Sequence, residues 1–486
     1  MTTTRRVPMW IAIAAVSVPV FMASLDNLVV TNALPVMQAD LGATIEDLQW
    51  FLNAYSLSFA SLILMAVALG DRLGRKRVFL AGIAIFTAAS VACALATTPE
   101  ALIAARVVQG AGGAAVLPLS LALLAGAVPD RMRAAAIGIW GGVAGLGVAL
   151  GPLIGGAVVE GLSWHAIFWL NVPIGIVALA VGAWSLPEAK GARARLDLTG
   201  LVLVVTGVFA LVFGIVRGND AGWTSGQVLA GLIGGGVLLV AFVAWEARTR
   251  EPLMPLGLFR DRSFSGANAV AVLFSIGIFG AIFILIQFMQ VVQGESPLDA
   301  GIKTMPWTMA PLVVAPLSGL IAPRVGTRTL IVTGTMLQAV GLAWFASVLA
   351  PDVAYSTMIP GFVAAGVGMG LVFAPSATAV LAHMAPENHA KASGTNTTLR
   401  EIGVALGVAI LTAVFTGAGG DFTPTEYTDA AIPALWVGVG FLVLATLAGL
   451  ALPAGKGTPE SSEGGAQGVA MAEPEPALVP ARRPVA

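Results

Sequence analysis

Apolar segments of similar length recur along almost the whole chain, separated by short stretches that hold most of the charged residues. A helix needs about 20 apolar residues to cross a bilayer, and fourteen segments have about that length. They cover residues 9–35, 48–69, 78–97, 100–126, 135–159, 165–186, 199–217, 227–246, 266–292, 300–322, 329–349, 352–383, 392–417 and 431–453. The pattern therefore predicts an all-α polytopic membrane protein with fourteen transmembrane helices.

The positive charges assign a side of the membrane to each end of the chain. An even number of crossings places both termini on one side, and Lys and Arg are enriched in cytoplasmic loops. With the N-terminus inside, all but four of the 25 basic residues fall in inner segments. The exceptions are Arg217 and Lys303 near outer loops, and Arg106 and Arg400 within helices. We therefore expect a multi-pass membrane protein with both termini cytoplasmic. The excess of 20 arginines over 5 lysines and the 58 glycines suggest a bacterial genome of high GC content, so we expect this membrane to be the bacterial plasma membrane.

An internal repeat divides the predicted helices into two halves. Residues 67–76 read V-A-L-G-D-R-L-G-R-K, and residues 319–328 read G-L-I-A-P-R-V-G-T-R, both in an inner loop after an even-numbered helix. The offset of eight helices implies two six-helix halves with an extra pair between them, a 6+2+6 arrangement typical of transporters whose site lies between repeats. The predicted segments are a cytoplasmic N-terminus at 1–8, an N-terminal six-helix bundle at 9–186, a linker with two extra transmembrane helices at 187–265, a C-terminal six-helix bundle at 266–453 and a disordered cytoplasmic tail at 454–486.

Composition excludes several classes of protein. Hydrophobic residues make up 57% of the chain and charged residues 10%, whereas soluble domains carry about 25% charged residues. The net charge of −1 gives no electrostatic basis for binding nucleic acid. Neither a phosphate-binding G-x-x-x-x-G-K-[ST] motif nor a metal-ligand cluster is present, so we expect no cofactor, no metal and no enzymatic activity.

Two ionisable residues are expected at the same depth in the outer half of the membrane. Asp26 lies in the first predicted helix and Arg106 in the fourth, and ionisable groups at such positions are by default candidates for function. A carboxylate shielded from water can exchange a proton in step with a substrate. A static ion pair that ties the two helices together is the alternative.

Arg400 and Glu401 lie deep in the thirteenth predicted helix. Adjacent helical residues point about 100° apart, so we expect these two side chains not to face one partner. A role in transport and a position at the membrane interface with one interhelical bond are both consistent with the sequence.

The fifth predicted helix carries Gly147, Gly151 and Gly155 at a spacing of four, together with Pro152 and Gly156. Small residues at this spacing form a smooth face that allows two helix backbones to approach closely, and a proline bends a helix. The pattern indicates tight packing, a pivot between the two halves, or both.

The inner loop between the second and third predicted helices contains Asp71, Arg72, Gly74 and Arg75. Its positive charges anchor the topology. The acid at a helix end and the glycine in the turn also favour a latch that different conformations make and break.

These segments together resemble the major facilitator superfamily, and within it the fourteen-helix drug:proton antiporter branch of multidrug efflux transporters. Residues 25–35 (L-D-N-L-V-V-T-N-A-L-P) are similar to the L-D-x-T-I-V-N-V-A-L-P motif, and residues 147–156 fit G-x-x-x-G-P-x-x-G-G. Residues 67–76 are similar to the loop motif G-x-L-A-D-R-x-G-R-K, with Val67 in place of its glycine, and residues 106–110 to R-x-x-Q-G. Residues 164–175 and 396–407 resemble two further signatures, so that the resemblance covers about 10–453.

The resemblance implies export of small hydrophobic compounds, cations among them, driven by the proton gradient and conferring antibiotic resistance. It assigns proton coupling to Asp26, Arg106 and Gln109. Candidate cavity residues are Trp50, Asn53, Tyr55, Arg400 and Glu401. A monomer is expected. The alternatives are export of one endogenous metabolite or self-made antibiotic, proton-coupled import, a non-transporting receptor or scaffold, and a membrane-embedded enzyme.

Overall fold

The computed structural model describes residues 8–189, 197–250, 252–384 and 389–453, and these residues form helices and connecting turns without strands. The predicted tail at 454–486 and nearly all of the N-terminal segment lie outside the described residues. The helices of the first half are α1 (Met9–Leu41), α2 (Ile45–Leu73), α3 (Arg75–Ala94), α4 (Pro99–Ala127), α5 (Asp130–Gly161), α6 (His165–Trp169) and α7 (Asn171–Ser185). We call these helices the first set.

An inserted pair and a second set follow along the chain. The inserted pair consists of α8 (Leu198–Val216), α9 (Gly218–Ala221) and α10 (Gly226–Glu246). The second set comprises η1 (Leu256–Arg260), α11 (Arg262–Gln287), η2 (Phe288–Val292), α12 (Pro297–Thr308), α13 (Ala310–Val325), α14 (Thr327–Val348), α15 (Tyr355–Leu381), α16 (His389–Gly417) and α17 (Pro424–Leu450).

The number of membrane-spanning helices agrees with the prediction from the sequence. In the described part of the chain, thirteen helices are long and apolar enough to cross a membrane, and a bent pair in α5 raises the number to fourteen. The two parts of this pair, 139–147 and 149–161, meet at 41°. Pro152 lies four residues after the bend and has no N–H to donate to the carbonyl of residue 148. The missing hydrogen bond accounts for the position of the bend.

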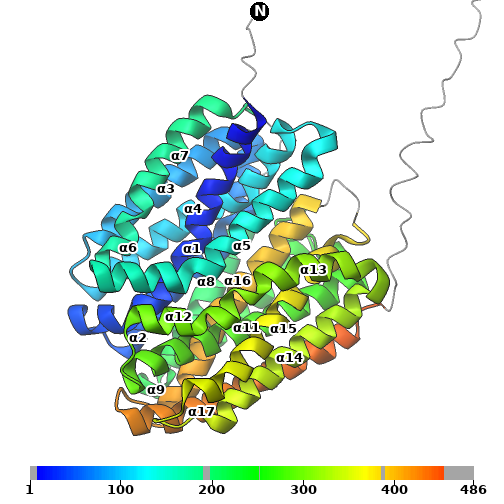
Figure 1. The fold of residues 1–486 in the computed structure, drawn as a ribbon. Coiled ribbons are helices and arrows are strands. Elements are labelled where there is room, and N and C mark those ends of the chain that lie inside the picture. The colour runs from blue at the N-terminus through cyan, green and yellow to red at the C-terminus, as the bar shows by residue number, and fades with distance from the viewer. Residues whose placement is uncertain (1–7, 190–196, 251, 385–388, 454–486) are drawn as a thin grey trace, which may run out of the picture.

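The helices of each set pack mainly on one another, as Figure 1 shows for the blue-to-cyan and the green-to-orange parts of the chain. In the first set α1 packs against α5, and α4 packs against α2 and α3. In the second set α11 packs against α16 and α17, and α14 against α15 and α17. The two sets meet along α2–α16 and α5–α12, and α8 contacts both α2 and α16. We call the side where α1 begins and α17 ends the terminal face, and the other side the opposite face.

Two turns at the terminal face show the internal repeat at the level of the backbone. Gly74 joins α2 to α3 with φ +117°, and Gly326 joins α13 to α14 with φ +90°. Each glycine donates its N–H to the carbonyl of the residue four before it, Gly70 and Ala322 respectively. Glycine adopts positive φ without strain. Both turns therefore need the glycine that the two copies of the repeat share.

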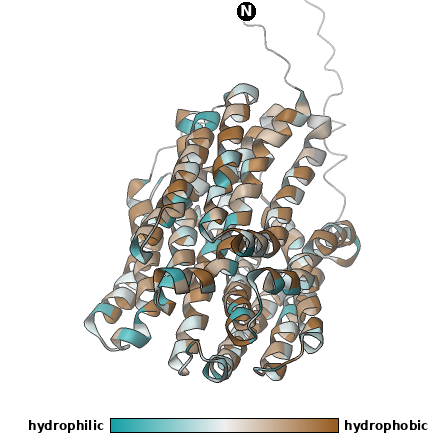
Figure 2. Cartoon of the chain, turned by 60° about the vertical axis from the view of Figure 1, so that its left-hand side comes forward, coloured by the Kyte–Doolittle hydropathy of each residue, from teal (hydrophilic) through white to brown (hydrophobic). Residues whose placement is uncertain are grey.

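Hydrophobic residues run along most of the length of the helices, as Figure 2 shows. Several large apolar side chains on the outside are highly exposed, including Leu320 (74%) and Val240 (70%). An apolar surface of this extent is unfavourable in water and suits contact with lipid.

Candidate functional site

A buried ion pair joins the first and fourth helices. Asp26 of α1 and Arg106 of α4 are 4% and 0% exposed, and Nη1 of Arg106 contacts Oδ2 of Asp26. The Nε–H of Arg106 donates to the carbonyl of Phe51 on α2 at 2.9 Å. The two residues thus lie at one depth, as their positions in the predicted helices indicated.

We call Asp26, Arg106 and the polar side chains bonded to them the acid centre. Neutral polar side chains complete it. Gln109 donates its Nε2–H to Oδ1 of Asp26 (2.9 Å) and accepts from Arg106 Nη1 (2.7 Å). Asn171 of α7 donates to the same carboxylate oxygen at 3.0 Å. Ser90 of α3 accepts from Gln109 at 2.9 Å. Because a buried carboxylate is costly without donors, this shell explains how Asp26 is held away from water. Asn171 and Ser90 were not among the residues predicted for the site, although Asn171 lies within the signature at 164–175.

A central cavity lies between the two sets, beside the acid centre. Its volume is about 110 Å³, which is below the roughly 300–1,000 Å³ of drug-sized sites, so its side chains must move to admit such a molecule. Both sets contribute to its wall. The lining residues are Ala23, Ser24, Leu28, Tyr55, Phe59, Leu117, Phe279, Phe373, Arg400 and Glu401.

Arg400 and Glu401 share no third partner among the described residues; they contact each other. Both side chains line the central cavity, and Arg400 Nη2 lies 3.2 Å from Glu401 Oε1. The 100° divergence applies to the Cα–Cβ bonds, and the long arginine side chain bends back far enough to reach its neighbour.

Two of the three candidate cavity residues on α2 lie elsewhere. Trp50 does not line the cavity: its ring stacks on Phe209 of α8, with centroids 6.5 Å apart and an interplanar angle of 13°. Asn53 is also absent from the cavity wall. It is fully buried, and neither polar atom of its side chain has a hydrogen-bond partner among the described residues. Tyr55 is the one that lines the cavity.

The glycines at spacing four on α5 allow close contact with α1. A Cβ added to Gly151 would lie 2.6 Å from Cβ of Leu28, and one added to Gly155 would lie 3.0 Å from Cα of Val29. At Gly147 the nearest atom is the carbonyl oxygen of residue 21, at 2.8 Å. Any side chain on this face would therefore push the two helices apart.

The other two residues of the same motif contact the second set. A Cβ on Gly156 would overlap the carbonyl oxygen of Pro297 and lie 2.6 Å from Cα of Leu298, at the start of α12. A Cβ on Gly301 of α12 would overlap the carbonyl of Pro152. The α5–α12 contact therefore requires glycine on both helices.

Asn32 of α1 bonds both sets at this contact, toward the opposite face. Its Nδ2–H₂ donates to the carbonyls of Pro152 (2.9 Å) and Pro297 (2.8 Å). Gln290 of η2 donates to Oδ1 of Asn32 at 2.9 Å and to its carbonyl at 2.8 Å. One buried side chain thus joins α1 and α5 of the first set to η2 and the start of α12 in the second set. Sequence reasoning missed both polar residues.

The loop between α2 and α3 is held by an internal ion pair and by a hydrogen bond to the segment after α7. Asp71 Oδ1 lies 2.7 Å from Arg75 Nε, one helical turn away. The backbone N–H of Arg75 donates to the carbonyl of Ala189, just after α7, at 2.8 Å. Arg72 is exposed, and no ion pair to another described residue is found for it. Gly74 supplies the positive φ of the turn.

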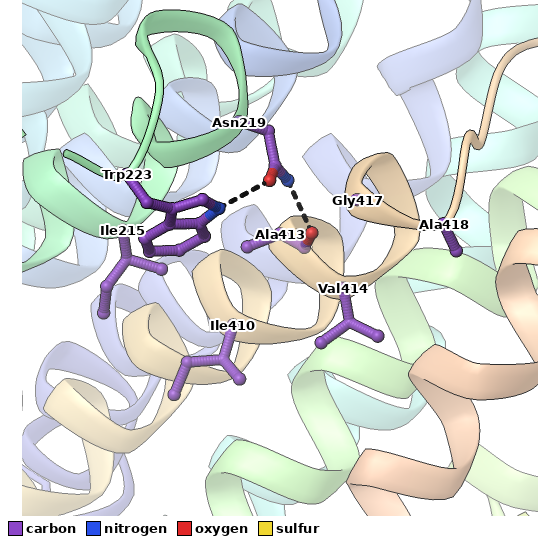
Figure 3. A pocket seen from close by; sticks show the side chains of 8 residues that line it. All are labelled: Ile215, Asn219, Trp223, Ile410, Ala413, Val414, Gly417 and Ala418. Carbon is purple, nitrogen blue, oxygen red and sulfur yellow. Dashed lines mark hydrogen bonds between the residues drawn. The ribbon is translucent and has the colours of Figure 1, made fainter. Parts of the chain in front are cut away.

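A larger cavity of about 510 Å³ lies between the inserted pair and α16 (Figure 3). Asn219 anchors its wall: Nδ2 donates to the carbonyl of Ala413 (2.6 Å), and Oδ1 accepts from Trp223 Nε1 (2.9 Å). Next to it, Arg217 donates to Glu46 of α2 at 3.0 Å, and this hydrogen bond raises the pKa of Arg217. No titratable side chain lines this cavity, whose residues are Ile215, Asn219, Trp223, Ile410, Ala413, Val414, Gly417 and Ala418. The central cavity is therefore the better candidate for coupled transport.

Comparison with known proteins identifies the family. The sequence model of the Major Facilitator Superfamily matches residues 16–408 and, in a second match, residues 267–479. The chain belongs to the major facilitator superfamily, and it is a multi-pass transporter, not an enzyme.

The relatives place it near exporters of drugs and antibiotics, in the fourteen-helix branch. It is 34% identical to the tetracenomycin C resistance and export protein of Streptomyces glaucescens over 87% of this chain and 79% of that one. It is 35% identical to the multidrug resistance protein Stp of Mycobacterium tuberculosis over 83% and 75% of the two chains. Among solved structures, a POT family transporter matches the fold with a TM-score of 0.66 at 15% identity, over 89% of this chain and 94% of that one.

Proposed function

We propose that the protein exports small hydrophobic compounds across the bacterial plasma membrane in exchange for protons, and so confers resistance to drugs or antibiotics. The observation that carries the proposal is the buried Asp26–Arg106 pair beside a cavity built from both helical sets. The relatives named for export and resistance support the direction of transport and a drug-like substrate.

The acid centre links the charge of one carboxyl group to the conformation of the helices around it. While Asp26 is ionised, it neutralises Arg106, and both are buried. A proton on Asp26 leaves the arginine charge without its partner, and an uncompensated buried charge costs several kcal/mol. Protonation therefore favours a rearrangement in which Arg106 is solvated or paired again. Gln109 hydrogen-bonds both residues, so it can keep a bond to one of them when the ion pair separates.

Alternating access would proceed as a rocking of two six-helix bundles, 9–186 and 266–453, joined by the linker at 187–265. In this mechanism the contact at Asn32 and the α5–α12 glycines is made in the state that opens toward the terminal face and is broken in the other state. With both termini cytoplasmic, that state loads substrate from inside. The α5 motif serves as the pivot, and Asp71, Arg72, Gly74 and Arg75 latch one state. We expect the protein to work as a monomer.

Inverted membrane vesicles with an inside-acid pH gradient test the proposal. The added compounds are ethidium, tetraphenylphosphonium, puromycin and tetracenomycin C, and proton release is recorded. We expect release with the native protein and none with Asp26→Asn. The control is Asp220→Asn, because Asp220 is exposed on α9. Export at the native rate by Asp26→Asn would refute the proton role.

A second candidate function is export of a single compound, such as a self-made antibiotic. The relative named for tetracenomycin C favours it, and the relative named for multidrug resistance favours broad specificity. In the same assay, release with one compound indicates a dedicated exporter, and release with several unrelated compounds indicates a polyspecific one.

A further inference from the structure

Tyr55 of α2 lies on the boundary between the central cavity and the acid centre. The residue lines the cavity together with Phe59. The guanidinium carbon of Arg106 lies 4.3 Å from the centroid of the Tyr55 ring. Of the three residues at the core of the acid centre, Asp26, Arg106 and Gln109, none lines the cavity. The aromatic ring therefore stands between the cavity and the ion pair.

Packing fixes the ring in this position. Tyr55 is 3% exposed and contacts the rings of Phe59 (5.8 Å) and Phe86 (6.4 Å). Gly113 leaves room for its hydroxyl, because a Cβ there would lie 3.1 Å from that oxygen. A ring held on several sides cannot move without moving the residues that it contacts.

The ring of Tyr55 adds an interaction to a guanidinium whose hydrogen bonds are incomplete. Nη1 contacts Asp26 and Gln109, and the Nε–H donates to the carbonyl of Phe51. Nη2 has no hydrogen-bond partner among the described residues, although the side chain is fully buried. The face of an aromatic ring attracts a guanidinium most strongly where water is excluded, so the π face of Tyr55, 4.3 Å from the guanidinium carbon, stabilises the cation.

Asp26 borders a second void, separate from the central cavity. This space of about 10 Å³ is bounded by Asp26, Asn171 and apolar residues of α1, α5, α6 and the segment joining α6 to α7. None of its lining residues lines the central cavity. Asp26 therefore borders the small void and not the central cavity, whereas Tyr55 borders the central cavity and contacts Arg106.

We propose that Tyr55 is the positioning residue through which a molecule in the central cavity acts on the acid centre. Its ring holds Arg106 against Asp26 and screens the carboxyl group from the cavity. A bound molecule that displaces the ring releases Arg106 from Asp26. The consequence for proton coupling rests on the proposed function, whereas the screening itself does not.

Carbodiimide labelling of the purified full-length protein in detergent tests the screening without any substrate. The probe is N,N′-dicyclohexylcarbodiimide, an apolar reagent for protonated carboxyl groups, with the sites quantified by mass spectrometry. Glu401 is an internal reference, because it faces the cavity with a 12% exposed side chain. In the native protein we expect labelling of Glu401 and little labelling of Asp26.

Two substitutions separate the ring from the hydroxyl. Tyr55→Leu keeps an apolar side chain but removes the π face, and we expect the Asp26:Glu401 labelling ratio to rise about tenfold or more, equivalent to about 1.4 kcal/mol. Tyr55→Phe keeps the ring, so its ratio should remain at the native value. Tyr55→Trp provides a second ring-bearing variant if the leucine variant proves poorly folded, and it should also keep the low ratio.

The inference is overturned by native labelling of Asp26 as strong as that of Glu401, by an unchanged ratio in a folded Tyr55→Leu protein, or by equal rises in the phenylalanine and leucine variants. Unchanged Glu401 labelling and a single gel-filtration peak establish folding. A failure of proton release in vesicles would refute the proposed function and leave this result standing. Conversely, native coupling in vesicles of Tyr55→Leu would refute the role of the ring in coupling.

Discussion

Gly156→Ala should weaken the closed contact at the opposite face. The added methyl group would overlap the carbonyl oxygen of Pro297 and lie 2.6 Å from Cα of Leu298. Both atoms belong to the backbone, so α5 and α12 must separate instead of a side chain turning away. Forcing one extra methyl group into a packed contact costs about 1–3 kcal/mol. If only the closed state bears this cost, the equilibrium shifts about 5- to 150-fold toward a state in which α5 and α12 are apart.

Gly142→Ala is a matched control on the same helix. No heavy atom lies within 4 Å of a Cβ built at Gly142. Both substitutions gain the same helix propensity, about 1 kcal/mol, so their difference isolates the steric effect. Hydrogen exchange measured by mass spectrometry over residues 297–308, the span of α12, is the readout.

We expect faster exchange over 297–308 in Gly156→Ala and native exchange in Gly142→Ala. Peptides from α14, residues 327–348, serve as the reference for global unfolding and should not change in either variant. Equal exchange over α12 in the two variants would mean that the α5–α12 contact does not depend on glycine at this position, and the steric argument would be wrong.

Two further experiments test a contact between the sets and a contact between the inserted pair and the first set. Asn32→Ala removes three side-chain hydrogen bonds, two of them to the carbonyls of Pro152 and Pro297; at about 1 kcal/mol each, the closed contact should lose about 2–3 kcal/mol, and unchanged exchange over 297–308 would contradict this. The Arg217–Glu46 ion pair involves an arginine side chain that is 37% exposed, so a double-mutant cycle of thermal stability with Arg217→Gln and Glu46→Gln should give a coupling energy below about 1 kcal/mol. A coupling above about 2 kcal/mol would show that this pair holds the inserted helices in place.

The helices and the repeat could be predicted because the evidence for them is local. The length of an apolar run decides whether it can cross a bilayer, and a glycine needed for positive φ marks the turn at Gly74 and again at Gly326. The division of the tenth predicted helix into α12 and α13 and the π-turn η2 were missed. Such irregularities depend on what packs around a helix, as at Gln290, and a hydrophobic pattern does not record it.

The ion pair of the site could be predicted, and most of its surroundings could not. Asp26 and Arg106 are conspicuous because burying a charge without a partner is costly. Asn171 and Ser90 are neutral, and neutral polar residues are common in membrane helices, so nothing in the sequence singles them out. Trp50 was expected at the cavity but packs on Phe209, a contact that depends on where the inserted pair docks.

The α5 motif combines two contact faces in ten residues. Gly147, Gly151 and Gly155 repeat every four residues and contact α1. Pro152 and Gly156 are also four residues apart, displaced by one position, so their face is turned by about 100° and contacts α12. The first face holds α5 within its own set, and the second makes the contact with the other set. A helix fixed to one set on one side and in close backbone contact with the other set on the next is suited to act as the pivot. For the same reason Gly156→Ala should disturb the contact between the sets while leaving the first set intact.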